Sequence, residues 1–180
     1  MKTLFSLLLS FVIVGSTLAQ SQPDPAKNVL KETIKQAKKE HKKAFIIFHA
    51  SWCTWCRKMD KSMNDEACKA LFEKNYVINH IVVLESKEKE NLNNPGSMDM
   101  LKKYKGDKGG IPFWLIFDEN GKLMTDSKTR AEGVLLDDTG SNIGCPSTDT
   151  EIADFIFKLK KTSKLNDAEL ETISTVFKKK

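Results

Sequence analysis

Two cysteines separated by two residues, Cys53 and Cys56, are the residues of this chain best suited to chemistry. They follow an apolar run at 44–48 and stand where a helix is expected to begin. At a helix start, the first sulfur faces free backbone N–H groups at the positive end of the helix dipole, which stabilises thiolate over thiol. Because the thiolate is the attacking species in disulfide exchange, this arrangement predicts a redox-active pair.

In this interpretation Cys53 is the nucleophile and is reachable from solvent, whereas Cys56 is better buried. Cys56 then resolves the mixed disulfide that Cys53 forms with a substrate. Thiol–disulfide exchange uses no metal or organic cofactor, so we expect none. A structural disulfide and a zinc site are the alternatives. So short a loop constrains the unfolded chain little, and no second pair of ligands stands at zinc-site spacing.

Helices and strands alternate along the rest of the chain. A continuous apolar run at 44–48 predicts a buried central strand, and apolar residues at helical spacing predict helices before and after it. We expect strands at 44–48, 76–84, 113–117 and 122–125, and helices at 28–42, 57–63, 66–74, 98–104, 149–160 and from 167. A surface loop is expected at 85–96, and 126–147 has little periodicity. This order indicates an α/β domain with one mixed sheet.

The first residues indicate the compartment. Lys2, an apolar run at 4–14 and small residues ending at Ala19 are typical of a secretory signal peptide covering 1–19. A membrane anchor is the alternative, but the run is shorter than the ~20 residues that span a bilayer. We therefore expect an extended leader at 20–27 and a secreted or periplasmic protein, with no membrane insertion after cleavage.

Composition excludes several classes of protein. Of the 180 residues, 40% are hydrophobic and 29% charged, as in ordinary globular domains, and the length suits one domain. Four cysteines are too few for a disulfide-stapled miniprotein. The net charge of +5 is spread along the chain, so we expect no nucleic-acid partner.

The segment 48–59 reads Phe-His-Ala-Ser-Trp-Cys-Thr-Trp-Cys-Arg-Lys-Met. It resembles the active site of the thioredoxin superfamily, in which a strand leads into an aromatic-Ala-x-Trp-Cys-x-x-Cys-Lys segment. The resemblance continues at 110–117, a Gly-Ile-Pro segment before a strand, and at 143–145, Ile-Gly-Cys before a helix. It covers about 28–162, and 163–180 is then a C-terminal helical extension. It implies a thioredoxin-like α/β fold, with a central mixed sheet flanked by helices and an extra C-terminal helix.

The resemblance also implies a substrate groove. Its features are a cis peptide bond at Ile111–Pro112 packed against the cysteines, and a surface lined by Trp52, Ile111 and Pro112. Extended protein substrates pair with the backbone before the proline, a form of strand addition. The implied partners are proteins with thiols or disulfides, and an unidentified redox partner that recycles the cysteine pair.

Two departures from the family bear on proton transfer. Ile47 stands where thioredoxin has a buried Asp that assists proton transfer at the second cysteine. Asp60, four residues after Cys56 and so on the same helical face, is a candidate substitute, with a solvated surface carboxylate as the alternative. His49 is either a base close to Cys53 or a partly buried structural residue.

The remaining cysteines have different expected roles. Cys68 is interpreted as a small buried hydrophobe on a short helix. Cys145 is expected at the rim of the groove, either structural or as a third thiol that samples the active-site disulfide. A Cys68–Cys145 bridge is possible but has no support from the pattern.

These observations predict an extracytoplasmic thiol–disulfide oxidoreductase that acts on protein thiols and disulfides, with reduction as the favoured direction. Thr54 and Trp55, between the cysteines, help to set the potential but do not decide the direction. The alternatives are a disulfide oxidase or isomerase, and a non-catalytic binding module of the same fold with a structural cysteine pair.

Overall fold

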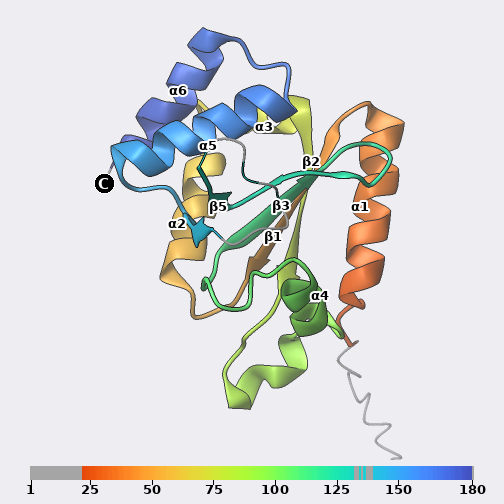
Figure 1. Ribbon diagram of the computed structural model, residues 1–180. Coiled ribbons are helices and arrows are strands. Elements are labelled where there is room, and N and C mark those ends of the chain that lie inside the picture. The colour runs from red at the N-terminus through yellow and green to blue at the C-terminus, as the bar shows by residue number, and fades with distance from the viewer. Residues whose placement is uncertain (1–21, 132–133, 135, 137–139, 180) are drawn as a thin grey trace, which may run out of the picture.

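The computed structural model describes residues 22–131, 134, 136 and 140–179. The predicted signal peptide at 1–19 lies outside the described residues. A central sheet is flanked by helices on both sides (Figure 1). None of the helices within the described residues combines the length and the apolar character needed to cross a bilayer.

Four strands form the main sheet in the order β2-β1-β3-β4. The central strand β1 (Lys43–His49) pairs in parallel with β2 (Tyr76–Val82) and antiparallel with β3 (Phe113–Phe117). The hairpin strand β4 (Leu123–Asp126) pairs antiparallel with β3. Every residue of β3 is buried, as the continuous apolar run predicts for a strand covered on both faces. The mixed sheet confirms the predicted fold class.

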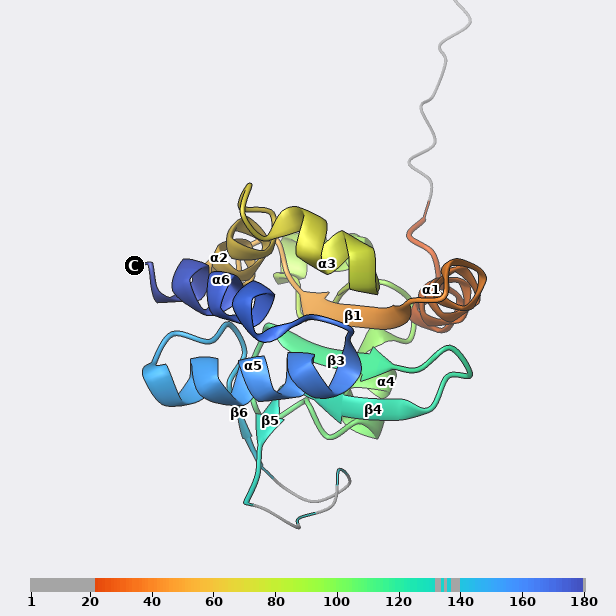
Figure 2. The ribbon, with the colours of Figure 1, turned by 90° about the horizontal axis from the view of Figure 1, so that it is seen from above.

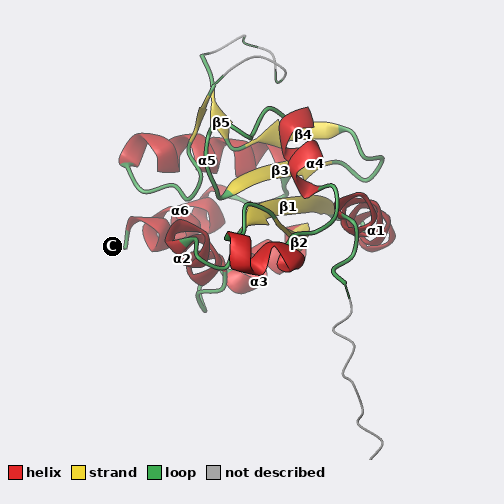
Figure 3. Cartoon of the chain, turned by 90° about the horizontal axis from the view of Figure 1, so that it is seen from below, coloured by secondary structure: helices red, strands yellow, loops and turns green. Residues whose placement is uncertain are grey.

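Six α-helices cover the two faces of the sheet. In Figure 2 the strands lie between α1 and the group formed by α2, α5 and α6, and Figure 3 shows the same enclosure from below, with helices red and strands yellow. The helices are α1 (Ala26–Glu40), α2 (Thr54–Met63), α3 (Lys69–Asn75), α4 (Ser97–Lys103), α5 (Asp149–Thr162) and α6 (Asp167–Lys178).

Alternation along β1 divides the core into two clusters. Ile46 and Phe48 face α1 and α4, whereas Phe45 and Ile47 face α2, α3, α5 and α6. Successive side chains of a strand point to opposite faces, so one apolar strand supplies both clusters. The C-terminal helix α6 contributes Ile173 and other residues to the second cluster, so it shares one core with the sheet.

Several boundaries differ from the predicted ones. Helix α1 begins at Ala26 rather than at 28, so the leader is shorter than expected. Helix α3 begins at Lys69 rather than at 66, because the Asp65 carboxylate accepts the Ala67 N–H at 3.0 Å and holds a turn there. Strand β2 ends at Val82 rather than at 84.

The two segments predicted to be irregular contain short elements. A 3₁₀ helix, η1 (Lys87–Leu92), lies within the expected loop at 85–96. Within 126–147, β5 (Lys128–Thr129) and β6 (Ser141–Asn142) pair antiparallel in a small second sheet. A buried ion pair anchors this region, since Arg130 donates to both carboxylate oxygens of Asp126 at 2.7 Å.

Candidate redox site

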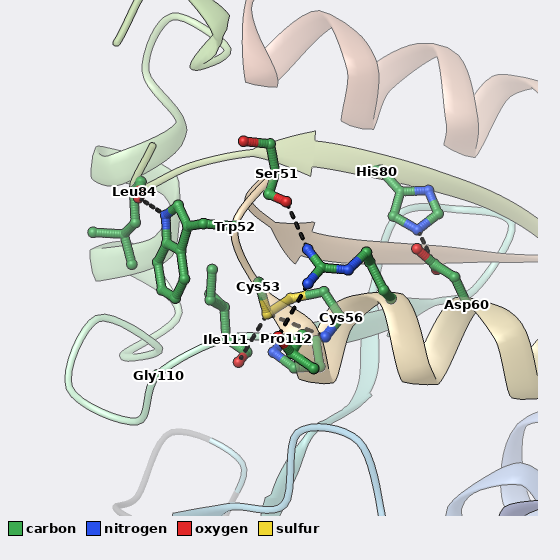
Figure 4. Close-up of a disulfide and its surroundings, with 12 residues drawn as sticks. Ser51, Trp52, Cys53, Cys56, Asp60, His80, Leu84, Gly110, Ile111 and Pro112 are labelled. Carbon is green, nitrogen blue, oxygen red and sulfur yellow. Dashed lines mark hydrogen bonds and ion pairs between the residues drawn. A yellow bond between two sulfur atoms is a disulfide. The ribbon is translucent and has the colours of Figure 1, made fainter. Parts of the chain in front are cut away.

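The turn between β1 and α2 positions the cysteine pair (Figure 4). Cys53 and Cys56 form a disulfide with a Cα–Cα distance of 5.3 Å. Cys53 is the N-cap residue of α2, and its Sγ accepts the backbone N–H of Cys56 at 3.1 Å. The sulfur of Cys53 thus occupies the position of a helix-capping acceptor, where negative charge is favoured.

A guanidinium group adds positive charge at the same helix end. Arg57 donates to the Ser51 carbonyl oxygen at 2.7 Å and to Thr54 Oγ1 at 3.0 Å, so it lies over the start of α2. No acidic residue occupies the first turn of this helix. Both features favour the thiolate form of a reduced Cys53.

The expectation that Cys53 is open to solvent is wrong for the disulfide form. Cys53 and Cys56 are each only 2% exposed and share a small cluster with Ala50, against which Ile111 packs. Cys53 Sγ lies 3.5 Å from the Ile111 carbonyl oxygen. The loop that carries Ile111 therefore covers the disulfide, and a substrate reaches the sulfurs only when this cover shifts.

The Ile111–Pro112 peptide bond is cis, as the resemblance implied. Its loop is held by Asn142 of β6, whose Nδ2 donates to the carbonyl oxygens of Gly109 and Gly110 at 3.0 Å and of Pro112 at 3.1 Å. The segment 126–147, to which no role was assigned, therefore supplies the side chain that secures this loop. No sequence motif marked Asn142, because its partners are more than 29 residues away.

A cavity of about 210 Å³ lies beside the covered disulfide. Ile111 and Pro112 line it, together with Trp55 and Cys145. Trp52, the third residue expected in the groove, is not part of its lining. It is 55% exposed, and its indole N–H donates to the Leu84 carbonyl oxygen at 2.7 Å (Figure 4).

A carboxylate secures the other side of the active-site turn. Glu85 is buried and accepts both the backbone N–H and the hydroxyl of Ser51, the latter at 2.8 Å. Burial on its own would raise the pKa of Glu85, but the two hydrogen bonds from Ser51 outweigh it and leave the pKa below its usual value. Sequence reasoning missed this contact, which joins residues 34 positions apart.

The candidate proton-transfer residue Asp60 has a specific partner. Its carboxylate lies 2.8 Å from Nε2 of His80 on β2, and the His80 ring lies 4.8 Å from the His49 ring, centroid to centroid. Burial, followed by the charge of His80, lowers the pKa of His49. Sequence reasoning named Asp60 and His49 separately and did not identify His80, which the parallel pairing of β1 and β2 places beside them.

The other two cysteines are free thiols and do not form a bridge. Cys68 is fully buried, which confirms its interpretation as a core residue. Burial raises the pKa of both Cys68 and Cys145 to about 11, so both are protonated at neutral pH. Cys145 lines the cavity, as expected of a rim residue, but a protonated thiol is a poor nucleophile. Nowhere in the described part of the chain do three potential metal ligands gather.

A disulfide at the start of a helix, next to a cis-proline loop and a mixed sheet, defines a thiol–disulfide site of the thioredoxin type. The family model for the thioredoxin-like domain matches residues 30–130, more than half of the chain. This chain belongs to the thioredoxin-like family, and that membership together with the Cys53–Cys56 pair supports thiol–disulfide redox activity.

Solved structures share the fold. A disulphide isomerase from Xylella fastidiosa Temecula1 is 24% identical, with a TM-score of 0.52 over 79% of this chain and 99% of that chain. A DsbH oxidoreductase is 19% identical, with a TM-score of 0.43 over 91% of this chain and 96% of that chain. The C-terminal domain of Neisseria meningitidis DsbD is 20% identical, with a TM-score of 0.42 over 58% and 84%. Comparison with curated proteins gives no match.

Proposed function

We propose that this protein is an extracytoplasmic thiol–disulfide oxidoreductase that acts on protein thiols and disulfides through Cys53 and Cys56. The observation that carries the proposal is the disulfide at the start of α2, where Cys53 Sγ accepts a helix N–H and Arg57 lies at the same end. A disulfide with only a structural role has no need of an environment that stabilises one of its thiolates.

In the reductive direction, the Cys53 thiolate attacks one sulfur of a substrate disulfide. The substrate bond breaks, its other sulfur leaves as a thiolate, and Cys53 is left in a mixed disulfide. Cys56 then attacks Cys53 Sγ and releases the second substrate sulfur, so two electrons pass to the substrate and the Cys53–Cys56 disulfide forms. The cycle needs no metal or organic cofactor, but it needs a redox partner that reduces the pair again.

Protein substrates bind along the loop that covers the disulfide. Ile111 and Pro112 line the cavity next to it, and exposed Trp52 stands on its other side, so a bound segment crosses the sulfurs between these two walls. An extended substrate would pair with the backbone at Ile111 by strand addition. Such binding would also displace the cover over Cys53.

Two features of the site act on the direction of electron flow in opposite senses. Burial of both sulfurs disfavours the thiolate and so favours the disulfide form, which suits a reductase. The helix N-terminus and Arg57 favour the thiolate, which suits an oxidase or isomerase. Reduction remains the direction we favour, because both sulfurs are 2% exposed whereas Arg57 is a surface cation.

Insulin reduction with dithiothreitol tests the activity. The wild-type protein should accelerate it, Cys53→Ser should abolish the acceleration, and Cys68→Ser should leave it unchanged. A wild-type rate equal to that of dithiothreitol alone would overturn the proposal and favour a binding module. Equilibration with glutathione then gives the direction, since related proteins range from about −270 mV for a reductant to about −120 mV for an oxidant.

The proposed location rests on the predicted signal peptide at 1–19. Expression of the full chain in a Gram-negative host, followed by fractionation and intact mass analysis, tests it. The periplasmic fraction should contain a protein that begins at Gln20. Retention of the uncleaved chain in the cytoplasm would refute the proposed location and leave the redox activity to be judged separately.

A further inference from the structure

Resolution of a mixed disulfide requires Cys56 to lose its proton, and the structure surrounds this sulfur with protein. Cys56 is 2% exposed, so bulk water is not adjacent to accept the proton. Ile47, on the β1 face that packs against α2, is 1% exposed and has no group that accepts protons. Another acceptor must therefore lie on this face.

Three titratable side chains are linked on the same face. Asp60 on α2 contacts His80 on β2 at 2.8 Å, and the His80 ring lies 4.8 Å from the ring of His49 on β1. Asp60 is one helical turn from Cys56 on one face of α2. The three side chains, called here the His49 cluster, thus connect two strands with the helix that carries the resolving cysteine.

Chain direction places His49 at the cysteine end of this cluster. Helix α2 runs back along β1, since Met59 and Met63 pack with Phe45 and Ile47 (Figure 4). His80 pairs in register with Ile47, and His49 lies two residues further along β1, toward the point where α2 begins. His49 therefore lies nearer to the disulfide than His80 does.

Exposure increases along the cluster away from the sulfurs. The cysteines are 2% exposed, His49 is partly buried, and the side chains of His80 and Asp60 are 34% and 35% exposed. A proton that reaches His49 therefore has a polar path to water that does not cross the apolar core.

The protonation state of His49 suits an acceptor. Burial and the charge of His80 lower the pKa of His49, while the charges of Asp60 and Glu85 oppose this change. The net lowering keeps the imidazole neutral at neutral pH, and a neutral imidazole accepts a proton.

We propose that His49 accepts the Cys56 proton in the resolving step, and that His80 and Asp60 are positioning residues that hold His49 and lead the proton to water. This inference rests on the proposed function. The Cys56 proton passes to a His49 ring nitrogen as the Cys56 electron pair forms the bond to Cys53 Sγ. The bond between Cys53 and the substrate sulfur breaks, and that sulfur leaves with the bonding pair as a thiolate.

Single-turnover oxidation of the reduced protein by hydroxyethyl disulfide tests this step. Acid quenching and mass analysis follow formation of the mixed disulfide on Cys53 separately from its resolution. His49→Asn should slow resolution about 100-fold, the low end of what general base catalysis contributes, while formation keeps its wild-type rate. His41→Asn is the matched control, because His41 is an exposed residue at the end of α1.

The pH dependence separates the proposal from a merely structural role. Asp60→Asn removes a charge that raises the pKa of His49, so the midpoint of the resolving rate should move to lower pH. His80→Asn removes a charge that lowers this pKa, so the midpoint should move to higher pH. A structural role gives no reason for opposite shifts, and these two variants decide the matter if His49→Asn does not fold.

Two different failures are distinguishable in this experiment. If the wild-type protein forms no mixed disulfide on Cys53, the proposed function itself is wrong. If the mixed disulfide forms and His49→Asn resolves it at the wild-type rate from about pH 5 to about pH 9, the proposed function stands and the role of His49 is refuted.

Discussion

Cys53 and Cys68 occupy formally similar positions, since each is the N-cap residue of a helix and each is buried. Their local geometry differs. Cys53 has extended backbone angles, and its Sγ accepts an N–H of α2. Cys68 has helical angles, and its side chain makes no capping hydrogen bond to α3. Position at a helix start is therefore insufficient, and the extended N-cap conformation brings the sulfur to the free N–H groups.

The neighbouring charges differ in the same sense. Arg57 lies at the start of α2, whereas Asp65 lies beside Cys68 and raises its pKa in addition to the larger effect of burial. The helices also differ in length, with 10 residues in α2 and 7 in α3. One buried cysteine is thus placed to react as a thiolate, and the other is a packing residue with a pKa of about 11.

Alkylation of the reduced protein should reveal the largest difference between the two cysteines. At pH 7, iodoacetamide should label Cys53 about 1000-fold faster than Cys68, because a helix-capping thiol with a pKa near 7 is about half ionised whereas Cys68 is almost wholly protonated. Mass analysis of the labelled peptides over time measures both rates. In denaturant the two rates should converge, and equal rates in the native protein would contradict the comparison.

Sequence alone predicted the parts of this contrast that depend on local pattern. The strand at 113–117 and the helix start at Cys53 follow from apolar runs and cysteine spacing, and the cis bond at Ile111–Pro112 followed from family resemblance. The start of α3 was misplaced, because the side chain of Asp65 forms a turn in a segment with ordinary helical composition.

The contacts that secure the redox site were not predictable in the same way. Glu85 and Asn142 lie in segments without periodicity, and each bonds a loop more than 29 residues away in the chain. His80 belongs to a strand that was predicted, but its pairing with Asp60 depends on the register of β1 and β2 and on where α2 crosses them. Such side-chain pairs arise only when the elements pack.

The wall that faces Cys53 provides the next test, since Cys68 is surrounded by core side chains instead. Asn142→Ala removes three hydrogen bonds to the cis-proline loop. We expect a loss of about 1–2 kcal/mol in the free energy of unfolding, and faster alkylation of Cys53 because its cover loosens. Chemical denaturation and the alkylation assay measure the two effects.

Asn91→Ala, at an exposed position of η1, is the control for Asn142→Ala. It should leave both stability and Cys53 alkylation unchanged. If Asn142→Ala lowers stability without changing alkylation, the loop does not limit access to Cys53.

Removal of the surface cation should have a smaller effect. Arg57→Gln should lower the alkylation rate of Cys53 by about threefold, because an exposed charge near a helix end contributes less than 1 kcal/mol and is screened by salt. The effect should shrink as salt is added, and Cys68 labelling should not change. A loss that is independent of salt would indicate that Arg57 acts by holding the Ser51–Thr54 turn.

The smallest expected effect concerns stability against pH, where the two cysteine regions also differ. The pKa of His49, behind the redox site, is lowered in the folded protein, so the unfolded chain binds more protons as the pH falls below 6.5. The contribution of His49 to stability is therefore complete above pH 6.5 and is lost as the pH falls toward the folded pKa. Thermal unfolding of His49→Asn should show a flatter loss of Tm over this window than the wild-type protein. The Glu85 contribution, by contrast, is lost only below about pH 4.5, because the folded pKa of Glu85 lies below its usual value. An identical pH profile in His49→Asn would show that the imidazole does not titrate differently on folding, and would remove the electrostatic distinction between the two cysteine environments on this face.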